Sequence, residues 1–228
     1  CLKHGLTVHN LLEAHVATID GEWLTLGSPA GDAPGLPLLS LLTGSEGMLG
    51  VVVEATVRLK PLPERVELLM AAFADVRRCA DAVGRIIASG IVPAGLEMMD
   101  EPAIRAAEAF VRCGYPTDAA ALLLCELDGL EHDVQHDLQA VEALLRACGA
   151  TTLRIATDAA ERLRMWSGRK SAFPAVGRLA PDYFCMDGTI PRRHLADVLE
   201  RIGEMSRAAG LPVSSSEILL SNVHSVTS

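Results

Sequence analysis

The sequence predicts an α+β fold, in which an antiparallel sheet carries helices on one face. Half of the 228 residues are hydrophobic, which is enough to bury a sizeable core. Short apolar runs alternate with segments whose apolar residues recur at the helical period. Gly, Pro, Asp and Ser separate these segments, so most elements are joined by short loops.

The part of the chain before residue 63 is predicted to be rich in strands. Residues 11–19 and 22–26 flank Asp20-Gly21, a dipeptide that favours a β-hairpin because both central turn positions accept positive φ. The β-branched run 51–59 predicts a third strand, which we expect to be buried. Pro61-Leu62-Pro63 ends this strand and marks the strongest domain boundary in the chain.

Beyond this boundary, strands and helices alternate. Strands are predicted over residues 66–73, 92–99, 119–127, 151–156 and 183–190, with a further strand entering at 211–213. Helices are predicted after the N-caps Asp75, Asp100 and Asp158, with Glu161 completing a capping box, and over residues 134–148 and 195–205. Units of this length indicate an antiparallel sheet with helices on one face, similar to a ferredoxin-like domain.

Charge and hydropathy argue against two classes of partner. The 20 Lys and Arg against 29 Asp and Glu give a net charge of −9, which opposes binding to nucleic acid. No apolar run reaches the roughly 18–20 residues of a membrane span, and the start of the sequence lacks the pattern of a signal peptide. We therefore expect a cytoplasmic protein.

The residue types that bind metals form no metal-site pattern. The six cysteines are scattered without a C-x-x-C pair, which favours buried free thiols over metal ligands or disulfides. His132 and His136 have the i, i+4 spacing of metal ligands but lack the Glu-x-x-His context, so solvated side chains are expected. The sequence predicts no metal site in this chain.

A glycine-rich segment, Gly44 to Gly50, precedes the strand at 51–59. Its three glycines let the backbone approach a ligand where a Cβ would clash, and its N–H groups suit a phosphate or a flavin edge. A tight turn into the strand accounts for the same glycines. The segment lacks the Lys of a Walker loop and the Gly-x-Gly spacing of a dinucleotide fingerprint.

This segment and several others resemble one family. Residues 44–52, Gly-Ser-Glu-Gly-Met-Leu-Gly-Val-Val, are similar to the glycine-rich segment of FAD-linked oxidases of the vanillyl-alcohol-oxidase type, and residues 54–63 continue the similarity. Further matching segments are residues 95–100, 123–129, 166–170 and 181–191. From residue 1 to about 213, the chain resembles the branch of this family that contains glycolate oxidases and D-lactate dehydrogenases.

The resemblance implies two domains and an FAD cofactor. Residues 1–62 would be the C-terminal part of a PCMH-type FAD-binding domain, and residues 63–213 an incomplete substrate cap domain. The serine-rich residues 214–228 would be a tail outside the family pattern, with few residues that pack into a core. The groups along the flavin, largely backbone groups, would come from Glu46, Gly47, Gly50, Val51 and Val52.

Arg169 is the residue that the resemblance assigns to the substrate. A planar guanidinium holds a carboxylate through two parallel hydrogen bonds, and Arg169 matches the arginine with this role in related 2-hydroxyacid dehydrogenases. Taken alone, Arg169 is typical of a solvated helix arginine, while Trp166 and Phe173 are typical of core anchors. The family's His-x-Gly-Asp-Gly-Asn and Gly-Glu-His-Gly segments, which supply metal ligands and the general base, do not occur in this sequence, so no catalytic residue is predicted.

The activity implied is the FAD-dependent oxidation of a small 2-hydroxyacid, glycolate or D-lactate, to the 2-oxoacid. The oxidase complexes of this family contain further subunits, so the resemblance also implies other subunits of a glycolate oxidase-like complex as candidate partners. Because the chain lacks the general base and the first half of the FAD domain, we expect it to be inactive alone. A non-catalytic ligand-binding module and a structural subunit of an oxidase complex remain the alternatives.

Overall fold

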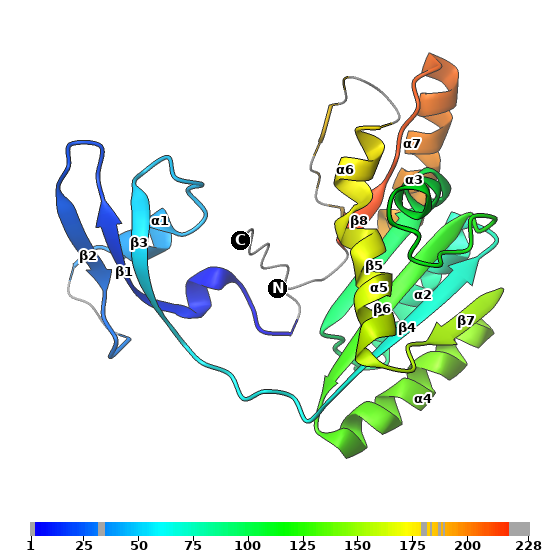
Figure 1. Cartoon of the computed structure of the whole chain (residues 1–228), viewed down its shortest axis with the longest axis horizontal. Coiled ribbons are helices and arrows are strands. Elements are labelled where there is room, and N and C mark those ends of the chain that lie inside the picture. The colour runs from blue at the N-terminus through cyan, green and yellow to red at the C-terminus, as the bar shows by residue number, and fades with distance from the viewer. Residues whose placement is uncertain are drawn as a thin grey trace. The chain divides into compact units, whose positions relative to one another are not determined.

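The computed structural model describes residues 3–31, 35–178, 182, 184–186, 188 and 190–218. These residues divide into two compact units, one from Lys3 to Leu62 and one from residue 63 to residue 218. Between them, residues 58–63 have no regular secondary structure. Figure 1 labels the helices and strands of both units.

The first unit is built on a three-stranded antiparallel sheet in the order β2-β1-β3. Its elements are η1 (Thr7–His9), β1 (Leu11–Ala17), β2 (Trp23–Gly27), α1 (Leu38–Leu42) and β3 (Val51–Val57). The predicted hairpin is confirmed, but of its two central residues Gly21 alone has a positive φ, at 80°. The turn is a three-residue loop that ends on Gly21, so Asp20 stays outside the left-handed region.

The first unit buries little apolar surface of its own. Its core consists of Ala14, Val16 and Leu42, with Leu26 and Leu39 packed against them. The third strand, predicted to be buried, is exposed along most of its length, and the side chains of Val51, Val52 and Val53 are 49–65% exposed. A β-branched run predicts that a strand forms, whereas burial depends on neighbours outside the local sequence.

The second unit contains a five-stranded antiparallel sheet in the order β7-β4-β6-β5-β8. Its strands are β4 (Arg65–Phe73), β5 (Gly95–Asp100), β6 (Ala121–Gly129), β7 (Thr152–Ile155) and β8 (Ser216–Ile218). Two β-α-β units, β4-α2-β5 and β6-α4-β7, interleave their strands in this sheet, which is the split βαβ arrangement of ferredoxin-like domains. The α+β class is therefore confirmed.

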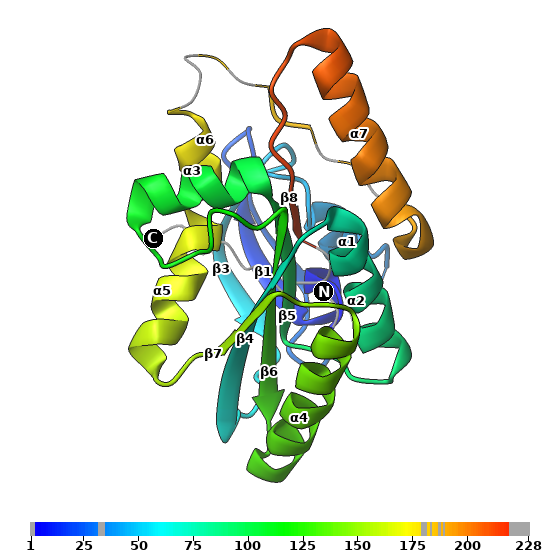
Figure 2. The ribbon, with the colours of Figure 1, turned by 90° about the vertical axis from the view of Figure 1, so that its right-hand side faces the viewer.

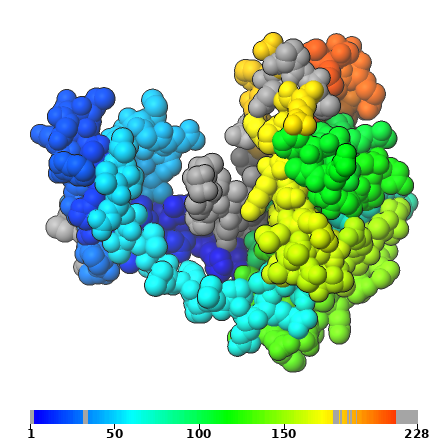
Figure 3. Space-filling view, viewed as in Figure 1, coloured from blue at the N-terminus to red at the C-terminus, as the bar shows by residue number. Residues whose placement is uncertain are grey.

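Helices cover both faces of this sheet, and the prediction of helices on one face is wrong. The helices are α2 (Val76–Ala88), α3 (Glu101–Val111), α4 (Glu131–Ala147), α5 (Ala159–Lys170), α6 (Ala172–Val176), η2 (Arg192–His194) and α7 (Leu195–Ala209). Figure 2 shows the sheet between α2, α4 and α7 on one side and α3, α5 and α6 on the other, and the space-filling view in Figure 3 shows α3 and α5 side by side. Among the described residues, no helix combines the length and the apolar character needed to cross a membrane.

The two helix layers follow from the side chains of the strands. Along β4, Leu69, Ala71 and Phe73 enter the core under α2 and α4, while Leu68 and Met70 enter the core under α3 and α5. A strand that is buried on both faces has an uninterrupted apolar run instead of an alternating pattern. The unbroken apolar run at the C-terminal end of β4 therefore indicates that helices cover both faces of the sheet.

The predicted helix N-caps are confirmed. Asp75, Asp100 and Asp158 each accept a hydrogen bond from the backbone amide three residues later, at 2.7, 3.0 and 2.7 Å respectively. These bonds satisfy amides that a helix leaves open at its first turn. In the predicted capping box, the Glu161 carboxylate accepts from the amide of Thr157 at 2.8 Å, one residue before the cap.

Three strand predictions need correction. The second strand of the sheet begins at Gly95, three residues later than predicted. In the segment predicted as a strand over residues 183–190, residues 184–186, 188 and 190 form no strand, and residues 183, 187 and 189 lie outside the described residues. The strand predicted at 211–213 is wrong, since residues 211–215 have no regular secondary structure. The strand β8 follows in the serine-rich segment, where it pairs with β5, because ladder hydrogen bonds need no apolar side chain. Residues 219–228 of the predicted tail lie outside the described residues.

Asp100 links α3 to the residue before the edge strand β8, and its carboxylate makes the stability of the fold depend on pH. Its carboxylate accepts from the amides of Ala103 at 3.0 Å and Ser215 at 2.6 Å, and burial raises its pKa from 3.8 to about 6. Between these two values the folded chain binds more protons than the unfolded chain, so the free energy of unfolding falls as pH rises. Relative to Asp100→Asn, the wild-type chain should lose about 2–3 kcal/mol of stability from about pH 4 to about pH 7. Urea unfolding of both chains tests this, and a difference that stays constant with pH would contradict it.

Candidate functional site

The glycine-rich segment before β3 forms an irregular turn. Gly44, Glu46 and Gly47 have positive φ values of 85°, 51° and 81°. For Glu46 this conformation costs roughly 1–2 kcal/mol, since a Cβ crowds the following carbonyl there. A glycine is needed at position 50 for a different reason, because a Cβ there would lie 2.6 Å from the side chain of Val16 on β1. Of the three glycines in the segment, Gly50 is therefore explained by its packing against β1.

The same turn leaves backbone donors open. Among the described residues, none accepts a hydrogen bond from the amides of Glu46, Gly47 or Leu49. A Cβ added at Gly47 would meet nothing within 4 Å, and the adjacent side chains of Val51 and Val52 are exposed. A row of open amides beside exposed apolar side chains fits the polar edge and the apolar ring of a flavin. Glu46 and Gly47 thus offer open backbone donors, and Val51 and Val52 offer exposed apolar side chains.

Arg169 lies in the last turn of α5 and is not a solvated surface residue. Its Nε donates a hydrogen bond to Oε2 of Glu97 on β5 at 2.9 Å. The side chain of Arg169 is 16% exposed and that of Glu97 is 1% exposed, so the ion pair is almost entirely shielded from water. This contact uses one of the five N–H donors of the guanidinium, whose two Nη groups carry the other four. The predicted substrate residue lies in the second unit, and the predicted cofactor residues lie in the first.

A second buried contact fixes the same helix one turn earlier. The indole Nε1 of Trp166 donates to the carboxylate of Glu126 on β6 at 2.6 Å, and burial raises the pKa of this glutamate. The ring of Trp166 lies over Gly95, where an added Cβ would approach it to 3.2 Å. Trp166 therefore packs against the sheet as predicted. The same prediction for Phe173 is wrong, because this side chain is 55% exposed.

Close packing also sets the position of α5 against the loop after α3. A Cβ at Gly168 would lie 2.4 Å from Sγ of Cys113 and 2.6 Å from the ring of Tyr115. The hydroxyl of Tyr115 donates to the backbone carbonyl of Met165, and the Glu108 carboxylate accepts from the amide of Tyr115 at 2.9 Å. Sequence reasoning missed the role of Gly168, although a glycine inside a helix indicates a packing constraint.

Among the described residues, the cysteines and histidines form no metal-binding group. The predicted burial is confirmed for Cys79, Cys113, Cys125 and Cys148, while Cys185 is exposed and Cys1 lies outside the described residues. Burial raises the pKa of Cys113 to about 12, so its thiol stays protonated. The side chains of His132 and His136 are 95% and 76% exposed. Within the described part of the chain, no group of three or more His, Cys, Asp or Glu residues could hold a metal ion.

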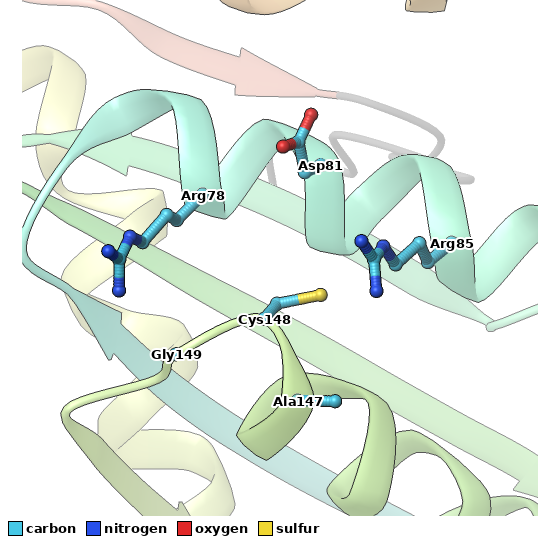
Figure 4. A pocket seen from close by; sticks show the side chains of 6 residues that line it. All are labelled: Arg78, Asp81, Arg85, Ala147, Cys148 and Gly149. Carbon is cyan, nitrogen blue, oxygen red and sulfur yellow. The ribbon is translucent and has the colours of Figure 1, made fainter.

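Arg169 lines neither of two surface hollows in the second unit. Figure 4 shows the first, of about 330 Å³, where Arg78 and Arg85 of α2 face Cys148 and Gly149 at the end of α4. Arg78 already pairs with Asp75 at 3.1 Å, and burial raises the pKa of the Cys148 thiol, so this hollow offers no reactive thiolate. The second hollow, of about 640 Å³, lies along α3 and α6.

Comparison with solved structures supports the fold. The chain is similar to alkyldihydroxyacetonephosphate synthase, with a TM-score of 0.64 and 18% identity, over 91% of this chain and 43% of that protein. It is also similar to 4-ethylphenol oxidase from Gulosibacter chungangensis, with a TM-score of 0.61 and 14% identity, over 94% of this chain and 51% of that protein. At this level of identity the similarity concerns the fold alone.

Comparison of sequences identifies the family. The Escherichia coli glycolate oxidase subunit GlcD is 60% identical over 214 residues, which are 94% of this chain and 43% of the relative. GlcD from Bacillus subtilis is 35% identical over 90% of this chain and 44% of the relative, and a probable mitochondrial D-lactate dehydrogenase from Danio rerio is 28% identical over 87% and 41%. The chain thus spans less than half the length of these relatives. Residues 62–224 match the family model described as FAD linked oxidases, C-terminal domain. The chain belongs to the FAD-linked oxidase family, whose cofactor is FAD.

Proposed function

We propose that this chain forms the substrate cap and part of the flavin-binding wall of an enzyme that oxidises glycolate or D-lactate to the corresponding 2-oxoacid. The observation that supports this most is the position of Arg169, which a buried carboxylate holds at the end of α5. A small 2-hydroxyacid offers one charged group for recognition, its carboxylate. A fixed guanidinium recognises this group and leaves the hydroxyl-bearing carbon free to react.

In this proposal the residues of the chain bind and orient. The Nη groups of Arg169 hold the two carboxylate oxygens of the substrate, and a bidentate contact fixes both the position and the rotation of the acid. The open amides of Glu46 and Gly47 hold the polar edge of the flavin, and the exposed Val51 and Val52 cover its apolar ring. FAD, when bound, supplies the acceptor for the hydride that leaves the substrate carbon.

We also propose that the protein works with further subunits. Its Escherichia coli relative is named as a subunit of glycolate oxidase. The first unit also exposes Trp23, Met48 and Leu49, whose side chains are 52–86% exposed. Exposed apolar patches of this kind mark surfaces that other protein segments cover.

The proposed function is tested by grafting. In the graft, the 214 aligned residues of the Escherichia coli relative are replaced by the corresponding residues of this chain. We expect the isolated chain to purify with little or no FAD, because cofactor affinity requires many preorganised contacts. The graft should bind FAD and reduce an acceptor dye when glycolate or D-lactate is added. A graft that binds FAD but oxidises neither acid would overturn the proposed function.

A further inference from the structure

Glu97 is the single charged or polar residue that is fully buried among the residues that the structure describes. It occupies β5 between Leu96 and Met98, whose side chains point to the opposite face of the sheet. Burying a carboxylate costs several kcal/mol unless a partner compensates it, and here the compensating group is Arg169. Because burying the Glu97 carboxylate costs free energy, the presence of a glutamate here requires an explanation other than filling the core.

Stability alone does not provide this explanation. Replacing a buried ion pair by apolar side chains of similar volume is often neutral or stabilising. Met99 and Leu124, which neighbour Glu97 on the same face of the sheet, are apolar and buried, so a hydrophobic pair would pack beside them without the cost of desolvating two charges. The Glu97–Arg169 pair therefore has a role other than stability, and the geometry of the contact indicates this role.

The hydrogen bond between Arg169 and Glu97 restrains the plane of the guanidinium. Glu97 projects from a strand that is paired on both sides, with β6 and with β8, so its backbone is held firmly. Arg169 ends a flexible side chain, and the hydrogen bond from its Nε restrains the last rotatable bonds of that chain. Because the contact is made through Nε, it uses none of the four N–H donors of the two Nη groups, which form the outer fork.

We infer that Glu97 is a positioning residue, which acts on the 2-hydroxyacid through Arg169 by holding the guanidinium in the plane required for bidentate binding of the substrate carboxylate. This inference rests on the proposed function. A lone arginine would attract any anion through its charge. The Glu97–Arg169 pair carries no net charge, so it selects its ligand by the geometry of two parallel hydrogen bonds.

A double-mutant cycle in the graft tests the inference. Glu97→Gln should lower kcat/KM for glycolate about tenfold, since the guanidinium loses its charged anchor. The double variant Glu97→Gln with Arg169→Lys should be no worse than Arg169→Lys alone, because both changes remove the same interaction. The matched control is Glu67→Gln, which removes a carboxylate that Arg65 contacts at 2.8 Å on another strand of the sheet, and it should leave kcat/KM unchanged. FAD content and thermal unfolding of each variant show that it is folded.

The outcomes separate this inference from the proposed function. If Arg169→Lys impairs the graft and Glu97→Gln does not, or if the two effects multiply, Glu97 has only a structural role and the inference is wrong. If Arg169→Lys has no effect, the proposed substrate contact itself fails. Should Glu97→Gln not bind FAD, Glu97→Asp replaces it in the cycle. This variant keeps the charge but withdraws it by one methylene, and it should show the same loss and the same lack of additivity.

Discussion

Replacing Arg169 by lysine in the graft should lower kcat/KM for glycolate about ten- to a hundredfold. Lysine keeps the positive charge but loses the planar fork, so a contact with two parallel hydrogen bonds becomes a contact with a point charge. In a site shielded from water, such a charge-assisted contact contributes about 1.5–3 kcal/mol. The exposure of Arg169, 16%, indicates that shielding of this kind is available. Steady-state kinetics with glycolate measures the loss.

The matched control lies on the same helix. Arg164 is exposed on α5, so Arg164→Lys makes the same chemical change where no substrate contact is proposed. We expect this variant to keep the kcat/KM of the unmodified graft. If Arg169→Lys also keeps it, the proposed substrate contact is wrong. In the isolated chain, where no hydride acceptor is expected to be bound, neither change should alter any turnover.

Gly168→Ala should destabilise the second unit by about 1–3 kcal/mol. The added Cβ would lie 2.4 Å from Sγ of Cys113 and 2.6 Å from the Tyr115 ring, so either α5 or the loop after α3 has to move. Alanine otherwise favours a helix over glycine by about 0.8–1 kcal/mol, so the steric cost must exceed this gain. Urea unfolding of the isolated chain, followed by circular dichroism, measures the change in the free energy of unfolding.

Gly84→Ala is the control for this prediction. Gly84 lies inside α2, is exposed, and an added Cβ would meet nothing within 4 Å. This variant should therefore gain up to about 1 kcal/mol from helix propensity. If both alanine variants stabilised the chain equally, α5 would not be packed against Cys113 and Tyr115 as the structure shows.

The fold could be predicted largely from local chemistry. Three aspartates open helices at the predicted positions because an N-cap is a local hydrogen bond, and the alternation of strands and helices indicated the class. The second helix layer was missed because the alternation of strands and helices along the chain does not show which face of the sheet each helix covers. The unbroken apolar run of β4 contained that information.

The candidate site was less accessible to sequence reasoning. Arg169 was found through family resemblance, and nothing local distinguishes it from a solvated arginine. Glu97 left a signal, a carboxylate inside the apolar run of β5, and a buried charge requires a partner. Its partner lies 72 residues further along the chain, and only the packing of α5 on the sheet reveals which cation it is.

Anaerobic mixing of the graft with substrate tests the central claim most directly, because it follows the flavin itself. The absorbance of the bound flavin near about 450 nm should fall when glycolate is added. Ethane-1,2-diol presents the same reacting carbon without a carboxylate, so at equal concentration it should reduce the flavin far more slowly. Equal rates of flavin reduction with both compounds would contradict the account, since no carboxylate contact would then guide the substrate.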